Sequence, residues 1–563
     1  MELLFESNYF MRLGKNLPQT SFLKGLLWTL TLAVSWGVSI PSAIAAETVT
    51  IHFGPFQQSV AIADLEKFAQ TGKLPEHLQI YSFVLTPQIG QLLNQRLQIE
   101  PNFADKFVAE LVRSPQGRQL VSSLEAAIPG STIEGIQSAL YLAVRRVNGL
   151  SAIGFLRAYP QQNITVDATQ ALQIALQFNA SNLQNQALGL VLARELSVEN
   201  NTSFQPSFDP AATGKKPVEQ QTLTLKDRKR DGQSPASGDR TIPVDIYFSP
   251  SSTPGPLVVI SHGFGANRRF FSYLAHHLAS HGITVAAIEH PGSNSLAINN
   301  AARQTNLAQL LPATEFIDRP KDVSFLLNEL EKLNTQPGKL QGKLNTDKTT
   351  VIGHSLGGYT ALALVGGELD LKQLQNFCKT ALSFRESPGD LLQCAAASLT
   401  ENQPNLQDQR IGRAIALNPL VGQLFGSNGM SRISQPVLIL AGTEDALTPA
   451  LTHQLRPFNQ ISGSKYLLTA IGATHLSITD PAYPISAATT LVREKRGDET
   501  NSLRQLIRGV TLAFVKQDTP QAPTYQQFLT PAYAQSLSTT EIPLRLNSDL
   551  PRNIQPWLSL LMK

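Results

Sequence analysis

Ser355 lies in the pentapeptide Gly-His-Ser-Leu-Gly, which occupies residues 353–357. A β-branched run precedes it and an apolar run follows it, so we expect a strand to end and a helix to begin at the serine. The pattern G-x-S-x-G places a serine in a tight strand-to-helix turn, where the glycines let the two elements approach closely. The helix N-terminus then favours negative charge that develops beside the serine. Such a serine is suited to attack a carbonyl carbon, and the alternative is a turn without chemistry.

A serine nucleophile needs a general base, and only two histidines follow Ser355 in the sequence. His475 comes directly after the apolar run 465–471, in a loop where a strand has just ended. His453 lies in the stretch 450–458, which predicts a helix with this histidine on its solvated surface. We therefore expect His475 to be the base.

The acid that orients the base is expected at the end of an earlier strand, because the chain order in this arrangement is serine, acid, histidine. Glu444 and Asp445 directly follow the apolar run 437–442. We favour Asp445, since Pro449 turns the chain back over the sheet, and Glu444 is its close rival. The preceding strand ends at Asn418, whose amide can orient a histidine but cannot stabilise an imidazolium charge.

Two backbone N–H groups must stabilise the oxyanion of the tetrahedral intermediate. The first is that of Leu356, the residue after the nucleophile. The second is expected from the loop after the apolar run 256–261, where Gly263 and Gly265 let the chain bend close to the substrate and make Phe264 the donor. The other histidines of this half show no ligand spacing matched by carboxylates, so neither a metal site nor a cofactor is expected.

Short apolar strands alternate with helices from residue 221 to residue 518, which predicts a parallel sheet with both faces covered. Between the helix after the nucleophile and the next strand lies an extra segment, 368–411. We expect this insertion to form a cap over the carboxyl ends of the strands, where such sheets bind ligands. The predicted fold class is therefore α/β, with a mostly parallel, doubly wound sheet.

The rest of the chain divides into four segments. Residues 46–200 predict an all-α helical domain, residues 201–220 are polar and predict a linker, and residues 519–563 form a C-terminal extension. Residues 1–45 combine positive charge, a continuous apolar run and the small-x-small pattern at 43–45, which predicts a signal peptide. We expect cleavage and export to the periplasm or the cell exterior, and an uncleaved anchor helix is the alternative.

The bulk composition indicates a globular protein without nucleic-acid character. Of 563 residues 42% are hydrophobic, and Lys+Arg 46 against Asp+Glu 42 gives a net charge of +4. No basic stripe with interleaved aromatic residues is present, so nucleic acid is not an expected partner. Cys378 and Cys394 are the only cysteines, and in an exported protein such a close pair favours a disulfide. Closing a loop of roughly 17 residues would stabilise the fold by about 3 kcal/mol.

Several stretches resemble the α/β-hydrolase superfamily: VVISHGFGANRRFFSYLAHHLASHGITVAAIEHPGS, RPKDVSFLLNEL, VIGHSLGGYTAL, and LILAGTEDALTP with GATHLS. Over about residues 220–515 the chain is similar to the branch that holds dienelactone hydrolases and platelet-activating-factor acetylhydrolases. It departs from the acetylhydrolases at Asn418, where they carry the triad Asp, and from the dienelactone hydrolases by using Ser355 in place of Cys. The resemblance therefore implies that the acid is Asp445. The front half resembles an N-terminal helical domain of unknown function found in exported bacterial hydrolases.

These residues predict an exported serine hydrolase that cleaves carboxylic esters through an acyl-enzyme, with Ser355 as nucleophile, His475 as base and Asp445 as its partner. The expected substrate is a small-molecule ester or a lipid, and contact with a membrane surface is left open. Two alternatives stand beside this prediction: a peptidase or amidase on the same fold, and a non-catalytic binding module with a vestigial hydrolase fold. Against the binding module, every expected catalytic position carries a competent residue.

Overall fold

The computed structural model describes residues 46–562 except for the segments 54–55, 82–84, 86–89, 91–92, 94–96, 99–100, 114, 146–149, 169, 172–179, 199–203, 229–239, 252–254, 302–310, 381–385, 400–404, 485–493 and 559–560. The predicted signal peptide, residues 1–45, lies outside the described residues. Within the described ranges, no helix is both long and apolar enough to cross a bilayer.

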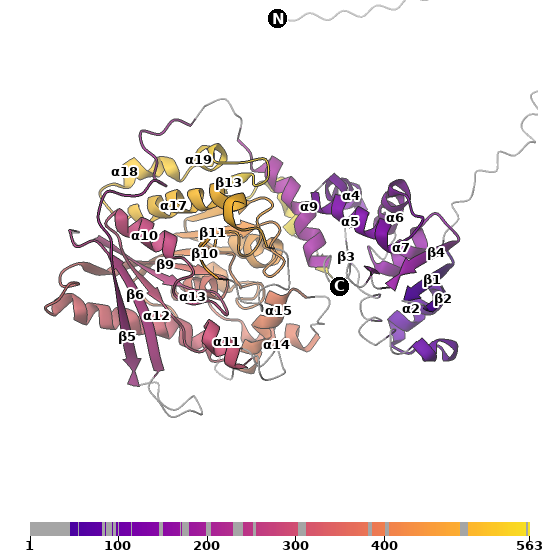
Figure 1. Cartoon of the computed structure of the whole chain (residues 1–563), viewed down its shortest axis with the longest axis horizontal. Helices are drawn as coiled ribbons and strands as arrows, with labels where there is room; N and C mark the ends of the chain where they lie inside the picture. The colour runs from indigo at the N-terminus through magenta and orange to yellow at the C-terminus, as the bar shows by residue number, and fades with distance from the viewer. Residues whose placement is uncertain are drawn as a thin grey trace, which may run out of the picture. The chain divides into compact units, whose positions relative to one another are not determined.

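The central element is a nine-stranded sheet with the strand order β13-β12-β11-β10-β9-β7-β8-β6-β5 (Figure 1). The strands β7 to β12 are parallel to one another, whereas β5, β6 and β13 are joined by antiparallel pairing. β7 and β8 are apolar and buried along most of their length, as parallel strands covered on both faces must be. The strands are β5 (Glu219–Asp227), β6 (Arg240–Phe248), β7 (Gly255–Ser261), β8 (Thr284–Ile288), β9 (Leu344–His354), β10 (Ile411–Leu417), β11 (Val437–Gly442), β12 (Lys465–Ala470) and β13 (Leu544–Asn547).

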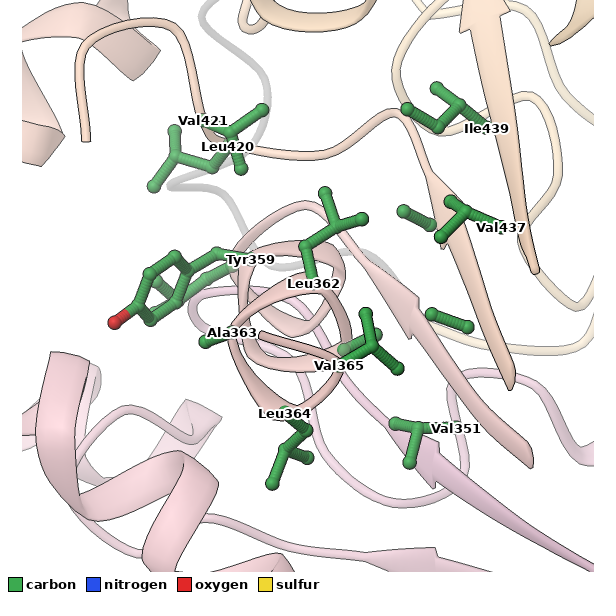
Figure 2. Close-up of a cluster of buried hydrophobic side chains, with 14 of the residues drawn as sticks. Val351, Tyr359, Leu362, Ala363, Leu364, Val365, Leu420, Val421, Val437 and Ile439 are labelled. Carbon is green, nitrogen blue, oxygen red and sulfur yellow. The ribbon is translucent and has the colours of Figure 1, made fainter. Parts of the chain in front are cut away.

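Helices cover both faces of this sheet (Figure 1). α12 (Glu315–Thr335) and α13 (Leu356–Leu364) pack on one face, and α10 (Ser272–Ser280) and α17 (Asn501–Lys516) pack on the other. α13 is buried on all sides because its residues are small or apolar, and Figure 2 shows the cluster that it forms with the strands: Val351, Tyr359, Leu362, Val365, Val437 and Ile439. The predicted α/β class with a doubly wound sheet is confirmed. The other helices of this region are α11 (Ser295–Ala301), α16 (Arg456–Gln460), α18 (Ala522–Tyr525), α19 (Pro531–Ser536) and α20 (Gln555–Leu558).

The insertion 368–411 contains two helices that a disulfide joins. They are α14 (Leu371–Thr380) and α15 (Pro388–Gln393). Cys378 in α14 is bonded to Cys394, directly after α15, with the two Cα atoms 5.6 Å apart. The disulfide expected from the sequence is therefore present, and it holds the two helices of the insertion together.

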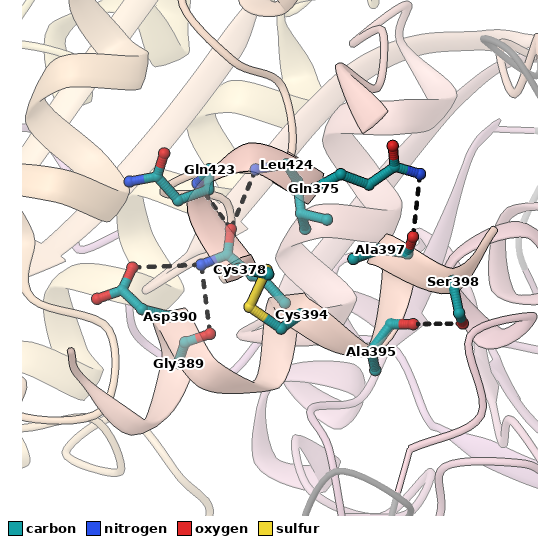
Figure 3. Close-up of a disulfide and its surroundings, with 11 residues drawn as sticks. Gln375, Cys378, Gly389, Asp390, Cys394, Ala395, Ala397, Ser398, Gln423 and Leu424 are labelled. Carbon is teal, nitrogen blue, oxygen red and sulfur yellow. Dashed lines mark hydrogen bonds between the residues drawn. A yellow bond between two sulfur atoms is a disulfide. The ribbon is translucent and has the colours of Figure 1, made fainter. Parts of the chain in front are cut away.

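Gln393, the residue before Cys394, joins the insertion to the loop that follows β10. The Oε1 atom of Gln393 accepts hydrogen bonds from the backbone N–H groups of Gln423 and Leu424, at 2.7 and 3.1 Å (Figure 3). The N–H of Gly389 donates to the carbonyl oxygen of Leu447 at 2.8 Å. The insertion thus contacts both the loop after β10 and the loop after β11, at the carboxyl ends of the strands.

The front part of the chain is not all-α, so that prediction was wrong. β1 (Thr48–Phe53) pairs antiparallel with β2 (Phe56–Ala61) and parallel with β4 (Asn163–Asp167). β4 is β-branched but short, and its partner strand lies far away in the sequence, so local periodicity could not separate it from the helices around it. The helices of this part are α2 (Ile62–Thr71), α4 (Pro101–Arg113), α5 (Pro115–Ala127), α6 (Ile133–Arg145), α7 (Ala152–Ala158) and α9 (Ala180–Glu195).

Two predicted boundaries of the catalytic domain also need correction. Phe204 and Phe208, in the predicted linker, pack their rings against Phe528 with centroids 6.1 and 4.9 Å apart. The extension after residue 518 supplies β13, in which Leu544 pairs with Ala470 of β12. Both segments therefore belong to the α/β fold. The sequence did not indicate this, because their isolated apolar residues find partners only in the tertiary structure.

Candidate active site

Ser355 forms the corner between β9 and α13, with a φ of 55° and a ψ of −117°. A residue other than glycine seldom adopts a positive φ, so this corner is strained. Hydrogen bonds hold it on both sides: its N–H donates to the carbonyl oxygen of Leu417 and its own carbonyl accepts from the N–H of Leu420, both at 3.0 Å. The strand, the strained corner and the helix expected from the pentapeptide are all present.

The glycines around Ser355 permit contacts that a side chain would block. A Cβ atom on Gly353 would lie 1.8 Å from the carbonyl oxygen of Gly357, and a Cβ atom on Gly357 would lie 2.1 Å from the carbonyl oxygen of Ser261. Both distances are far below van der Waals contact, so only glycine fits at either position. The second contact also brings α13 against the end of β7, where the loop that contains Phe264 begins.

His475 and Asp445 form a buried pair in the loops after β12 and β11. The Nδ1 atom of His475 lies 2.7 Å from Oδ2 of Asp445, and their side chains are 5% and 0% exposed. Glu444, the rival acid, instead forms an ion pair with Lys495 at 3.0 Å. The carboxylate that contacts the histidine is thus that of Asp445. Because this carboxylate faces Nδ1, that nitrogen carries the proton of the neutral ring, and Nε2 keeps the lone pair that a base requires.

Burial and charge act on His475 in opposite directions. Burial alone would lower its pKa, but the Asp445 carboxylate, with a smaller contribution from Glu494, favours the protonated ring. The result is a pKa of His475 above its ordinary value. Glu494 is held nearby because it accepts a hydrogen bond from the N–H of Leu476 at 2.9 Å.

Asn418 lies between the loops that carry this pair, a supporting position that we did not predict. Its Nδ2 donates to the carbonyl oxygen of His475 at 3.2 Å, and its Oδ1 accepts from the N–H of Gly442 at 3.1 Å. Like Ser355, it has a positive φ, in this case 45°. Asn418 thus occupies the end of β10, where an acid was considered in the sequence. Its side-chain amide joins the His475 loop to the end of β11. The only signal in the sequence was its place at a strand end.

The two expected oxyanion donors adjoin Ser355. Leu356 is the first residue of α13, so its N–H has no acceptor within the helix. Phe264 lies in the loop after β7, and in the described part of the chain its N–H donates no backbone hydrogen bond. A Cβ atom on Gly263 would lie 3.3 Å from the Cβ of Ser355, so this loop passes close to the serine. Among the described residues, both N–H groups thus lack a backbone acceptor near the serine, and their role as oxyanion donors stays a prediction.

His453 is buried, so the prediction of a solvated helix surface was wrong. Its Nδ1 accepts hydrogen bonds from the N–H groups of Val421 and Gly422 at 3.2 and 3.0 Å. Its Nε2 lies 3.1 Å from Oδ1 of Asp390, in α15 of the insertion. The segment Leu451–Leu455 is a π-helical turn, and regular helical spacing could not indicate which of its residues face inward.

Two family models match the chain. Residues 237–309 match the model described as "Platelet-activating factor acetylhydrolase, isoform II", and residues 45–167 match "Alpha/beta hydrolase of unknown function (DUF1400)". Together with the order of the sheet and the corner at Ser355, these matches show that the chain belongs to the α/β-hydrolase superfamily. The superfamily expected from the sequence is confirmed.

Three curated relatives share the name platelet-activating factor acetylhydrolase. The chain is 26% identical over 297 residues to platelet-activating factor acetylhydrolase of Canis lupus familiaris, a match that covers 46% of this chain and 56% of the relative. The enzymes of the same name from Cavia porcellus and Bos taurus are 22% and 23% identical, over 46% and 48% of this chain and 57% and 62% of their own lengths. The matched region thus spans little more than half the length of these relatives.

Proposed function

We propose that the chain is a serine hydrolase that cleaves carboxylic esters. The observation that carries the proposal is the buried contact of 2.7 Å between His475 Nδ1 and Asp445 Oδ2, at the same edge of the sheet as the strained corner of Ser355. A histidine oriented by a carboxylate, at the same sheet edge as a serine on a strand-to-helix corner, is the arrangement expected of a site that activates a hydroxyl nucleophile. The names of the curated relatives support an ester as the bond that is cleaved.

In the proposed reaction Ser355 Oγ attacks the ester carbonyl while His475 Nε2 accepts the hydroxyl proton, and Asp445 stabilises the imidazolium that forms. The N–H groups of Phe264 and Leu356 stabilise the tetrahedral oxyanion. His475 returns the proton to the departing alcohol, and a water molecule activated by the same ring then hydrolyses the acyl-enzyme. These steps need no cofactor, and across the described ranges no group of three or more His, Cys, Asp or Glu side chains could hold a metal ion.

We also propose that the disulfide-linked insertion forms part of the acyl pocket. A Cβ atom on Gly389 of α15 would lie 3.0 Å from Cδ1 of Leu420, so the insertion packs directly on that leucine. The N–H of Leu420 in turn donates to the carbonyl oxygen of Ser355. The insertion therefore reaches a neighbour of the nucleophile. The word acetylhydrolase in the names of the relatives favours a short acyl chain within the proposed class of lipid-like or short-chain esters.

The test compares p-nitrophenyl esters from acetate to palmitate with the corresponding anilides, using the purified chain. We expect the esters to be hydrolysed much faster than the anilides, and the chain-length profile to separate a short-chain esterase from a lipase. Equal or faster cleavage of the anilides would instead support a peptidase or amidase. A folded chain that hydrolyses neither set would support the non-catalytic binding module.

Replacing Asn418 by aspartate should lower kcat by about 10- to 100-fold, because small displacements of a catalytic group carry costs of this size. A carboxylate cannot donate to the carbonyl oxygen of His475, and it places negative oxygens against that carbonyl. The free energy of unfolding should fall by about 1–3 kcal/mol, as it does when a buried acceptor loses its donor.

The exposed Asn345 offers a matched control, since its Oδ1 accepts from the N–H of Asp347 at 3.1 Å, as a carboxylate can equally do. Ester turnover and urea unfolding of Asn418→Asp and Asn345→Asp measure both effects. An unchanged kcat in Asn418→Asp would show that Asn418 does not hold the histidine loop.

We propose further that residues 1–45 direct export and are removed after Ala45. The support is the positive charge, the apolar run and the small-x-small pattern of this segment. Fractionation of a bacterial host that expresses the chain, followed by N-terminal sequencing of the exported protein, should give Ala46 as the first residue. An intact N-terminus in the membrane fraction would support the anchor helix.

A further inference from the structure

Arg319 is a buried arginine of α12 that the proposed mechanism does not use. The acceptors of its guanidinium include the carbonyl oxygen of His262, Oγ of Ser293 at 2.7 Å and Oγ1 of Thr360 at 3.3 Å. The residue is 0% exposed. A charge without access to water destabilises a fold unless its partners are in place, so these contacts are a specific requirement of this region.

Two of these partners position the loop that contains Phe264. His262 comes two residues before Phe264, and its carbonyl oxygen accepts directly from Arg319. The carbonyl oxygen of Ser293 accepts from the N–H of Gly265 at 2.9 Å, on the other side of Phe264. Arg319 therefore holds this loop on both sides of the expected oxyanion donor, once directly and once through Ser293.

The third partner belongs to the nucleophile helix. Thr360 lies in α13, one turn after Leu356, and its Oγ1 donates to the carbonyl oxygen of Leu356 at 3.0 Å. The guanidinium thus contacts both the loop that supplies the Phe264 N–H and the helix that supplies the Leu356 N–H. Because guanidinium donors are arranged in a rigid planar fork, one side chain can set the spacing of two elements.

We propose that Arg319 is a positioning residue for the oxyanion hole, which fixes the spacing between the N–H groups of Phe264 and Leu356. The inference rests on the proposed ester hydrolysis. An oxyanion hole acts through donors that are already in place when the charge develops, so a displaced donor slows the chemical step. Substrate binding precedes that step and does not depend on the oxyanion. Loss of Arg319 should therefore lower kcat without a comparable change in KM.

The same buried network contains a matched control. Burial lowers the pKa of Arg319 to about 10, while Glu315 and Asp322 oppose this shift, so its guanidinium stays charged at neutral pH. Arg240 donates to Asp322 at 2.8 Å and to Glu315 at 2.9 Å. Among the hydrogen bonds of the described residues, none joins Arg240 to the Phe264 loop or to α13. Replacing Arg240 thus disturbs the network but leaves the direct contacts of Arg319 with His262 and Thr360 in place; of the three partners, only Ser293, whose Oγ donates to Glu315, is shared by the two arginines.

The test measures kcat and KM on p-nitrophenyl acetate, together with Tm, for the parent chain, Arg319→Lys and Arg240→Lys. Lysine keeps the charge, but a single ammonium cannot reproduce the fork. We expect kcat of Arg319→Lys to fall by about 100-fold, since loss of one oxyanion donor costs about 10²–10³ in kcat. KM should change little. Arg240→Lys should lower Tm to a similar extent and keep its kcat.

Two further measurements keep the inference testable if Arg319→Lys folds poorly or the parent hydrolyses no ester. Thr360→Val has nearly the same shape and removes the hydroxyl that accepts from Arg319 and donates to the carbonyl oxygen of Leu356. It leaves the contacts of Arg319 with the Phe264 loop in place, so it should lower kcat by a smaller factor. Hydrogen–deuterium exchange of the segment 262–266 should be faster in Arg319→Lys than in Arg240→Lys, whatever the activity.

Equal losses of kcat in the two lysine variants would overturn the inference, because they would reduce Arg319 to a structural role. A rise in KM at constant kcat in Arg319→Lys, or an unchanged kcat in Thr360→Val, would overturn it as well. A parent chain that hydrolyses no ester would refute the proposed function. The exchange rate of 262–266 would then decide by itself whether Arg319 holds this loop, and unchanged exchange in Arg319→Lys would show that it does not.

Discussion

Replacing Ser355 by alanine is expected to abolish ester hydrolysis, with kcat lower by about 10⁵- to 10⁶-fold, the size of effect seen when a serine nucleophile is removed. His475 would still be oriented by Asp445 but would have no hydroxyl to deprotonate. The fold should survive, because alanine keeps the Cβ atom and meets the φ of 55° at no greater cost than serine does. Turnover of p-nitrophenyl acetate and Tm of the purified variant measure the two effects.

Ser398 provides a matched control for this substitution. It is an exposed serine of the insertion whose Oγ donates to the carbonyl oxygen of Ala395 (Figure 3). Ser398→Ala also removes one hydroxyl from the carboxyl side of the sheet, and it should keep its turnover. If Ser355→Ala were folded and as active as Ser398→Ala, Ser355 could not be the nucleophile.

Replacing Asp445 by asparagine should have the second largest effect, a decrease of about 10⁴-fold in kcat, as follows when an amide stabilises the wrong histidine tautomer. The carboxylate is held in place by the N–H and Oγ1 of Thr448, at 2.7 and 2.8 Å. Its geometry therefore depends on local contacts, and the variant should keep its fold. An amide NH₂ in place of Oδ2 would donate to Nδ1 of His475 and move the ring proton to Nε2, where it blocks the base.

The pH dependence of the same variant gives a second readout. The proposed reaction needs neutral His475, so kcat/KM should rise as pH increases through the pKa of this residue. Asp445 raises that pKa, whereas burial lowers it. Without the carboxylate the pKa of His475 should fall, and the acidic limb of the profile should move to lower pH.

Glu444→Gln is the matched control for Asp445→Asn, because Glu444 is adjacent in the chain but pairs with Lys495. It should change neither kcat nor the acidic limb. If Glu444→Gln were the more damaging of the two substitutions, the acid would have been assigned to the wrong residue.

The positions of Ser355, Asp445 and His475 could be predicted because the signal for each is local. A β-branched run, five residues with two glycines and an apolar helix describe the corner at Ser355 without any information on the rest of the fold. Asp445 and His475 directly follow apolar runs, and the carboxyl ends of parallel strands lie at one edge of a sheet. The sequence could not decide between Asp445 and Glu444, because that choice depends on Lys495, which lies far along the chain.

The residues that support the candidate site could not be predicted, because their roles depend on contacts between distant segments. Asn418 gained a role only when the loops of His475 and Gly442 came together around it. Arg319 looks like an ordinary charged helix residue in the sequence, yet the fold buries it between the loop of Phe264 and α13. The sheet in the front part escaped prediction for the same reason, since β4 finds its partner only across several helices.

Labelling with a fluorophosphonate, followed by mass spectrometry of the peptides, tests the central claim most directly. An activated serine oxygen attacks the phosphorus of this reagent and displaces fluoride, so the adduct marks the nucleophile itself. The account predicts a single adduct, on the peptide that contains Ser355, and no adduct on Ser355→Ala. A folded chain that takes up no label, or that carries the label on another serine while Ser355 stays unmodified, would contradict it.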